Sequence, residues 1–131
     1  MRTIKFRGWG IHVKRWIFGD FSGSYPNDGA AIQYYDEEDG WMCDDVNEKT
    51  VGQFTGAFDC EGREIYEGDI LSACYGHAPN IIEVTGVVEF VHSGFALRFG
   101  EDAGVWLDQL IHAEIVGNIH DNPELLKGCK G

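Results

Sequence analysis

Four glycines, each placed to interrupt an extended segment, constrain the fold of this 131-residue chain more than any other feature. They lie in the stretch VGQFTGAFDCEGREIYEGDI, residues 51–70, at Gly52, Gly56, Gly62 and Gly68. Between them, residues 59–62 have the pattern of a type I turn, in which Asp59 accepts a backbone N–H and glycine adopts a φ that other residues avoid. Tight turns between short extended segments indicate a β-rich fold.

Segments on both sides of this stretch predict further strands. Residues 3–9 alternate like a half-buried strand, residues 16–18 return beside them, and residues 30–35 pair with Trp41 and Met42 as a hairpin. Five apolar segments then predict a small barrel, with Gly86 in the longest one as a bulge or bend at a barrel corner. These segments are residues 70–75, 81–91, 95–99, 105–107 and 113–119.

The C-terminal residues 121–128, DNPELLKG, predict a short helix. Asn122 is the expected N-cap, Pro123 takes the first helical position and Gly128 ends the helix. Leu125 and Leu126 are expected to dock on the sheet or on a neighbouring subunit, because so short a helix is unstable alone.

The predicted fold class is therefore mainly β, with N-terminal hairpins, an SH3-like, partly open five-stranded barrel and a short C-terminal helix. The length suits one domain with one core. We predict a single domain over residues 1–131, with a hairpin region over 1–50 and a barrel region over 51–131.

Three sequence blocks resemble one protein family. RTIKFRGW near the start, VGQFTG with the D-x-x-G turn and IYEGDI in the middle, and EIVGNIHDNPELL near the end resemble the YopX family of phage and prophage proteins. The resemblance implies a small β-rich phage protein of unknown biochemical function, and it brings no catalytic motif.

Seven positions are predicted to be structural signatures. Asp69 is expected to accept N–H groups that the turn at Gly68 leaves free. Gly117 is expected to permit close backbone approach, and the Asn118 amide to bridge to a neighbouring strand. The full set is Gly52, Gly56, Gly62, Gly68, Asp69, Gly117 and Asn118.

The formal net charge is −12, from 22 acidic and 10 basic residues. A surface of this sign repels phosphate backbones and anionic lipid, so we expect no direct nucleic-acid or membrane binding. Half of the basic residues lie in the first fifteen positions, where they could meet an acidic partner such as another subunit. The four cysteines form no C-x-x-C pair and no secretory leader is visible, which predicts the bacterial cytoplasm.

Candidate sites are few. Cys74 and His77 have a zinc-like spacing that Cys43, Cys60 or Cys129 would have to complete, but structural zinc usually shows two close ligand pairs. His92 and Ser93 are neighbours in sequence, and neighbours in a turn normally point apart. We therefore predict no catalytic residue, no metal site and no cofactor.

The acidic turn at residues 36–39, with Asp44, Asp45 and Glu48 nearby, has two interpretations. It is a cation site or a decoy surface, or it is a solvated turn that protects a strand edge. Calcium loops need a ligand spacing that DEEDG lacks, which favours the solvated turn.

The many Trp and Tyr residues suit either subunit contacts or packing between hairpins and barrel. The leading hypothesis is a non-enzymatic phage accessory protein that forms homo-oligomers and binds an unknown phage or host protein. One alternative is an acidic nucleic-acid mimic that inhibits a host DNA-acting protein. The other is a metal-dependent hydrolase using Cys74 and His77.

Overall fold

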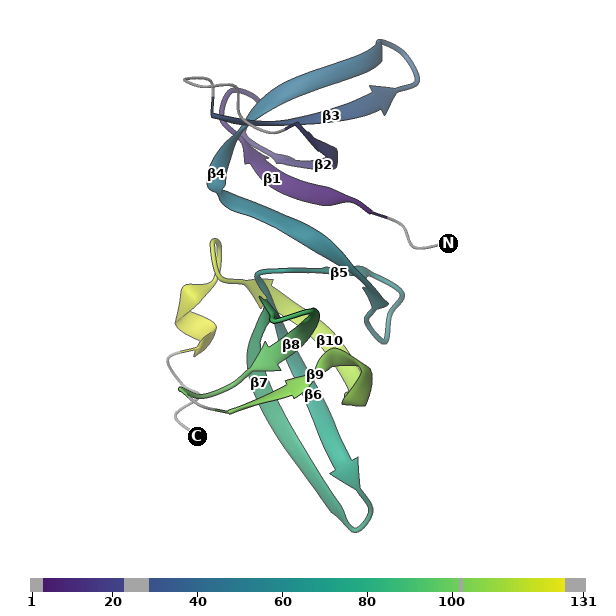
Figure 1. Cartoon of the computed structure of the whole chain (residues 1–131), viewed down its shortest axis with the longest axis vertical. Coiled ribbons are helices and arrows are strands. Elements are labelled where there is room, and N and C mark those ends of the chain that lie inside the picture. The colour runs from purple at the N-terminus through teal and green to yellow at the C-terminus, as the bar shows by residue number, and fades with distance from the viewer. Residues whose placement is uncertain (1–3, 23–28, 102, 127–131) are drawn as a thin grey trace. The chain divides into compact units, whose positions relative to one another are not determined.

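The computed structural model describes residues 4–22, 29–101 and 103–126, and this part of the chain is mainly β (Figure 1). It forms two antiparallel five-stranded sheets, and the described residues contain no α-helix. The chain divides into two compact units, a first unit over Met1–Phe54 and a second unit over Thr55–Gly131. The predicted boundary after residue 50 and the division at Phe54 both fall within one long strand, β4 (Gly40–Phe58).

The first unit is a ring of paired strands. Its members are β1 (Phe6–Gly10), β2 (Trp16–Ser22), β3 (Ala30–Asp36) and the first part of β4. The predicted hairpins are confirmed, because β1 pairs with β2, and β3 pairs with β4. β2 also pairs with β3, and β1 pairs with β4 in a register that matches Phe6 with Gln53. This last pairing, which no local pattern predicts, closes the four strands on themselves.

Alternation along these strands buries a small apolar core. Ile17, Ala30, Ile32 and Val46 are buried together, and the half-buried Phe6 is among the side chains packed around them. Removing this surface from water stabilises the unit, at about 25 cal/mol for each Å² of apolar area. The opposite face of β3 and β4 is left to solvent, as the two-residue period of a strand requires.

The second unit contains an open five-stranded sheet in the order β10-β6-β7-β8-β9. The five predicted apolar segments correspond in order to its strands, so this part of the prediction is confirmed. Within the described residues no pairing joins the edge strands β9 and β10, and the barrel is only partly closed. The strands are β6 (Asp69–His77), β7 (Asn80–Val91), β8 (Gly94–Arg98), β9 (Gly104–Trp106) and β10 (Ile111–Asn118).

Two short elements complete the second unit. β5 (Glu64–Tyr66) pairs with β4, and the 3-10 turn η1 (Leu107–Gln109) connects β9 to β10. The core gathers apolar side chains from β5 to β9, with Leu107 and Leu110 packed against it. Its buried members are Ile65, Leu71, Ala73, Val88, Leu97 and Val105.

Gly86 does not form the predicted bulge. β7 pairs with β6 without a register shift, and Gly86 lies opposite Leu71 in that ladder. A Cβ at position 86 would lie 2.4 Å from the Arg98 carbonyl oxygen, so glycine is needed here because another backbone approaches closely. The register shifts of this sheet lie instead in the β10–β6 pairing.

The predicted C-terminal helix is also wrong. Residues Pro123–Leu126 form one turn of 3-10 helix, η2, closed by a bond from the Leu125 N–H to the Asn122 carbonyl. The expected N-cap oxygen, Asn122 Oδ1, instead accepts the N–H of Asn118 at 3.3 Å. Leu126 does lie beside the sheet, in a hollow that Val87 and Phe99 also line, whereas Gly128 is outside the described residues. No helix in the described part of the chain has the length and apolar character to span a membrane.

Candidate functional site

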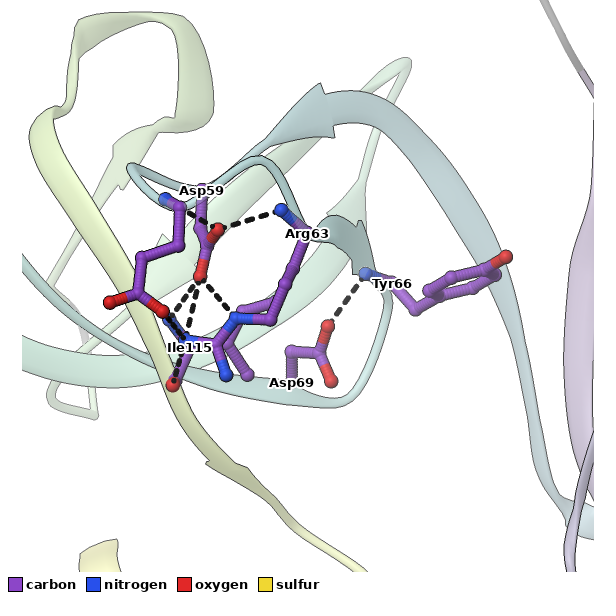
Figure 2. A network of polar contacts seen from close by, with 6 residues as sticks. Asp59, Arg63, Tyr66, Asp69 and Ile115 are labelled. Carbon is purple, nitrogen blue, oxygen red and sulfur yellow. Dashed lines mark hydrogen bonds and ion pairs between the residues drawn. The ribbon is translucent and has the colours of Figure 1, made fainter.

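Asp59 is the centre of a polar network in the second unit (Figure 2). It occupies the first position of the predicted turn, and its side chain is fully buried. Its Oδ1 atom accepts the N–H groups of Glu61 at 3.0 Å and Arg63 at 2.9 Å. Its Oδ2 atom accepts the Arg63 Nε–H at 3.0 Å and the Ile115 N–H at 3.1 Å.

These bonds keep the buried carboxylate ionised. Burial by itself raises the pKa of Asp59, but the N–H groups of Arg63, Ile115 and Glu61, together with the Arg63 guanidinium, outweigh it. The net pKa lies below the ordinary value, because every one of these donors binds the charged form. A carboxylate that favours its charged form is suited to accepting hydrogen bonds that hold a structure and poorly suited to accepting a proton.

The network also covers the edge of β10. Ile115 donates its N–H to Asp59 and accepts the Arg63 Nη2–H at its carbonyl oxygen, over 3.1 Å in each case. The Cys60 N–H reaches the Ala113 carbonyl at 2.8 Å. One carboxylate, one guanidinium and one backbone N–H thus take the place of a neighbouring strand.

The second buried carboxylate, Asp69, stabilises the next turn. Gly68 has a φ of +94°, a conformation that favours glycine, and its N–H bonds the Val88 carbonyl at 2.9 Å. Asp69 Oδ2 accepts the Tyr66 N–H at 2.7 Å across this turn, as Figure 2 shows. The arrangement has the geometry expected from the sequence pattern at Gly68 and Asp69.

The other signature positions lie in both units. Gly56 and Gly62 have φ values of +87° and +82°, and Gly52 pairs with Arg7 in the β1–β4 ladder. A Cβ at Gly117 would lie 2.7 Å from Asn122 Oδ1, so the approach that requires glycine here comes from a side chain and not from the backbone as predicted.

Asn118 corrects one expectation. Its side-chain amide forms no hydrogen bond to a neighbouring strand among the described residues. Asn118 Oδ1 accepts the N–H groups of His120 and Asp121 at 2.9 Å, and Nδ2 donates to Asp121 Oδ2 at 3.1 Å. The side chain is used locally because the chain turns immediately after β10.

No metal centre forms in the described part of the chain, where no three His, Cys, Asp or Glu side chains are grouped to hold an ion. Cys74 is a half-buried free thiol within β6, and His77 is exposed at the end of that strand. Cys43 and Cys60 are exposed free cysteines, and Cys129 lies outside the described residues.

Two arrangements resemble parts of a hydrolytic site. His92 is in the turn after β7 with a φ of +58°. Among the described residues, no hydrogen bond joins its side chain to that of Ser93. Cys60 and His112 both line a pocket of about 360 Å³, which the sequence gives no reason to expect. No hydrogen bond between described residues joins those two side chains, and Asp59 beside them is fully used by the network.

A second pocket, of about 490 Å³, surrounds Trp106 at the edge of the second sheet. Ala96 and Gly104 are among its small lining residues, and Arg98 and Glu101 are among its charged ones. Arg98 donates to Glu89 Oε2 at 2.8 Å, and this hydrogen bond raises the pKa of the guanidinium. The sequence signal for this pocket is a Trp within a short strand, which does not by itself distinguish a surface site from a core position.

In the acidic turn, one carboxylate accepts hydrogen bonds from the backbone of the turn itself. Asp36 Oδ1 accepts the N–H groups of Glu38 at 2.7 Å and Asp39 at 3.2 Å. Asp44 accepts the hydroxyl of Tyr34. Such bonds fit the interpretation as a solvated turn.

Comparison with known proteins gives a fold and a family. No curated protein matches the sequence. The structure is similar to the crystal structure of protein EF1440 from Enterococcus faecalis, with 24% sequence identity and a TM-score of 0.53. The match covers 96% of this chain and 99% of that chain, and at this identity it shows the fold alone.

The family match is more specific. The sequence matches the model of the family described as YopX protein over residues 5–127, which reaches into both units and includes the second and third of the three blocks and most of the first. The chain therefore belongs to the YopX protein family.

Proposed function

We propose that the protein is a non-enzymatic interaction module that self-associates through the outer face of its first unit. The observation that carries this proposal is an exposed aromatic pair. Tyr35 is 62% exposed and Trp41 is 67% exposed. The two rings meet edge to face across the β3–β4 hairpin, with centroids 5.5 Å apart. Rigid rings with a polar tip are typical of interface centres.

Charge in the same unit favours a second copy as the occupant. The hairpin turn beside the pair carries the exposed Glu37, Glu38 and Asp39, whereas the turn between β1 and β2 carries the exposed Lys14 and Arg15. A two-fold interface uses the same surface of both subunits, so each acidic turn can face the basic turn of the other copy. Opposite charges around an apolar centre also fix the register of such a contact.

Two further observations support the proposal. Both buried carboxylates, Asp59 and Asp69, have oxygens that hold backbone N–H groups, which is structural and not catalytic use. The strand order of the second sheet, with a 3-10 turn before the last strand, supports an SH3-like barrel. On the proposed function, the module acts as a phage or prophage accessory protein in the bacterial cytoplasm.

The test is the mass of the purified protein in solution as a function of concentration. We expect a dimer that dissociates on dilution, and a double variant, Tyr35→Ser with Trp41→Ser, that stays monomeric. The matched control is Ile81→Ser with Ile82→Ser, which removes exposed apolar side chains from the second unit and is expected to dimerise normally. A monomeric wild type, or a double variant that dimerises equally well, would contradict the proposal.

The alternatives give different results in the same preparation. A nucleic-acid mimic predicts a monomer whose binding to a basic DNA-acting protein weakens steeply with salt. A metal-dependent hydrolase predicts stoichiometric metal in protein purified without chelator, which elemental analysis measures.

A further inference from the structure

The two edge strands of the second sheet, β10 and β9, differ in how their outer backbone groups are bonded. The Asp59 network holds the β10 edge, with both backbone groups of Ile115 bonded to side chains. β9 pairs with β8 through Gly104, Val105 and Trp106, and no described residue pairs with its other edge. An unpaired strand edge is a template for another extended chain.

A pocket of about 490 Å³ lies next to this open edge. Trp106 is 44% exposed and lies opposite Ala96 on the neighbouring strand, so a small residue leaves the ring uncovered there. A Cβ added at Gly94 would come within 3.4 Å of the Trp106 ring, which shows that the glycine keeps that side of the indole open. An indole bordered by small residues suits a flat apolar side chain.

The charge around the edge selects the kind of partner. Residues 55–131 contain four basic and 13 acidic residues, for a formal charge of −9. Glu101 lines the pocket and Asp108 follows β9, while the charge of Arg98 is offset by Glu89. A second copy would bring the same negative charge to this edge, whereas a basic segment would be attracted to it.

We propose that the β9 edge and the Trp106 pocket together bind an extended basic peptide segment of another protein. The segment adds a strand to the sheet beside β9, and one of its apolar side chains packs against the Trp106 ring. Backbone hydrogen bonds supply binding along the edge, and the pocket and charge supply selectivity. This site is on the second unit and does not depend on self-association of the first.

The probe is a blocked synthetic peptide in which lysine alternates with valine around a central phenylalanine. Calorimetry measures its affinity, and amide chemical shifts locate its contact. We expect micromolar binding, with the largest shifts at residues 103–106. Two matched peptides, one with glutamate for lysine and one N-methylated along the backbone, are expected not to bind.

Variants of the protein identify the site. Trp106→Ala is expected to weaken the peptide about tenfold or more, and Trp106→Phe to retain most of the affinity. Trp41→Ala serves as the control, since it should impair self-association and leave peptide binding unchanged. A dispersed amide spectrum shows that each variant is folded.

Several outcomes would overturn the proposal. They are no binding of the lysine peptide, equal binding of the glutamate peptide, shifts that avoid β9, and a folded Trp106→Ala variant with unchanged affinity. Loss of dimerisation in Trp106→Ala would show instead that the β9 edge contacts a second copy.

Discussion

The two units solve the same problem, the exposed edge of a β-sheet, in different ways. In the first unit β1 pairs with both β2 and β4, so the ring is closed mainly by strand pairing, with one bond from the Trp9 N–H to Thr50 Oγ1 where the register shifts. In the second unit the sheet stays open, and the side chains of Asp59 and Arg63 bond the edge of β10. Among the described residues, closure by strands uses no charged side chain as a bonding partner, although Arg7 on β1 is buried, whereas closure by side chains requires a carboxylate that stays ionised and fully bonded.

The units also differ in charge. Residues 1–54 contain six basic and nine acidic residues, for a formal charge of −3, compared with −9 for residues 55–131. The second unit thus places a buried carboxylate in the more negative half of the chain. We expect it to be the more sensitive unit to polar substitutions and to acid, and the following predictions test that expectation.

The largest effect is expected from Asp59→Ala. The change removes the acceptor of three backbone N–H groups and leaves the Arg63 guanidinium without its buried partner. The half-exposed Arg63 side chain can be hydrated, but each N–H group left without an acceptor costs about 1–3 kcal/mol, and three such groups make this the largest effect. Hydrogen exchange resolved by residue should show protection lost in β5 to β10 and retained in β1 to β3. Equal loss of protection in both units would show that the second unit does not depend on Asp59 more than the first does.

A core substitution should act on the first unit instead. Ile32 is fully buried among Ile17, Ala30 and Val46, and Ile32→Ala is expected to cost about 2–5 kcal/mol. The same exchange experiment should now show protection lost first in β1 to β3. Protection lost first in the second sheet would mean that the ring does not depend on its own core.

Asp69→Ala should destabilise the second unit by a smaller amount. It leaves the buried Tyr66 N–H without the carboxylate oxygen that accepts it, at a cost of about 1–3 kcal/mol. Glu114→Ala, an exposed acid on β10, is the control and should change the free energy of unfolding by less than about 0.5 kcal/mol. Denaturant melts followed by tryptophan fluorescence compare the two. A folded, fully stable Asp69→Ala protein would argue against the structural role.

Gly68→Ala tests the backbone of the same turn. At a φ of +94° a Cβ strains the chain, and we expect a loss of about 1 kcal/mol. The same melts give the value. A neutral or stabilising substitution would show that the turn relaxes to negative φ.

The smallest effect is a difference in pH dependence. Because the folded-state pKa of Asp59 is lowered, its ionised form stabilises the second unit above the unfolded-state value of about 3.9. That contribution is lost as the pH falls below this value and through the lower folded-state pKa. Wild-type stability should therefore fall more steeply in this range than that of Asp59→Asn, as chemical denaturation in acidic buffers measures. If the free energy of unfolding of both proteins changed equally with pH, Asp59 would not be a source of the acid sensitivity.

Local patterns predicted most of the elements. The five apolar segments became β6 to β10, and the Asp59 turn formed with its N–H bonds, because alternation and turn chemistry act over a few residues. The bond from the Ile115 N–H to Asp59, the β1–β4 pairing and the pocket at Trp106 join residues far apart in sequence. No local propensity encodes such contacts.

Asn122 and Gly86 show why two of the predictions were wrong. The capping pattern around Asn122 was a correct local signal, but the N–H of Asn118 took the capping oxygen. Gly86 was correctly singled out, but the carbonyl that approaches it belongs to Arg98 on another strand. At Asn122 a competing N–H four residues earlier decided the outcome, and at Gly86 a carbonyl on another strand did.

The pairing of β1 with β4 also bears on how the chain is made. Phe6 is synthesised well before its β4 partner Gln53, so this pairing can form only once Gln53 has been made. Until then the nascent chain can form separate hairpins but not the ring, and joining them costs the entropy of closing a long loop. We therefore expect the first unit to fold late and in one step, with the long-range pairing setting its rate. Until β4 is complete, β1 can pair only with β2.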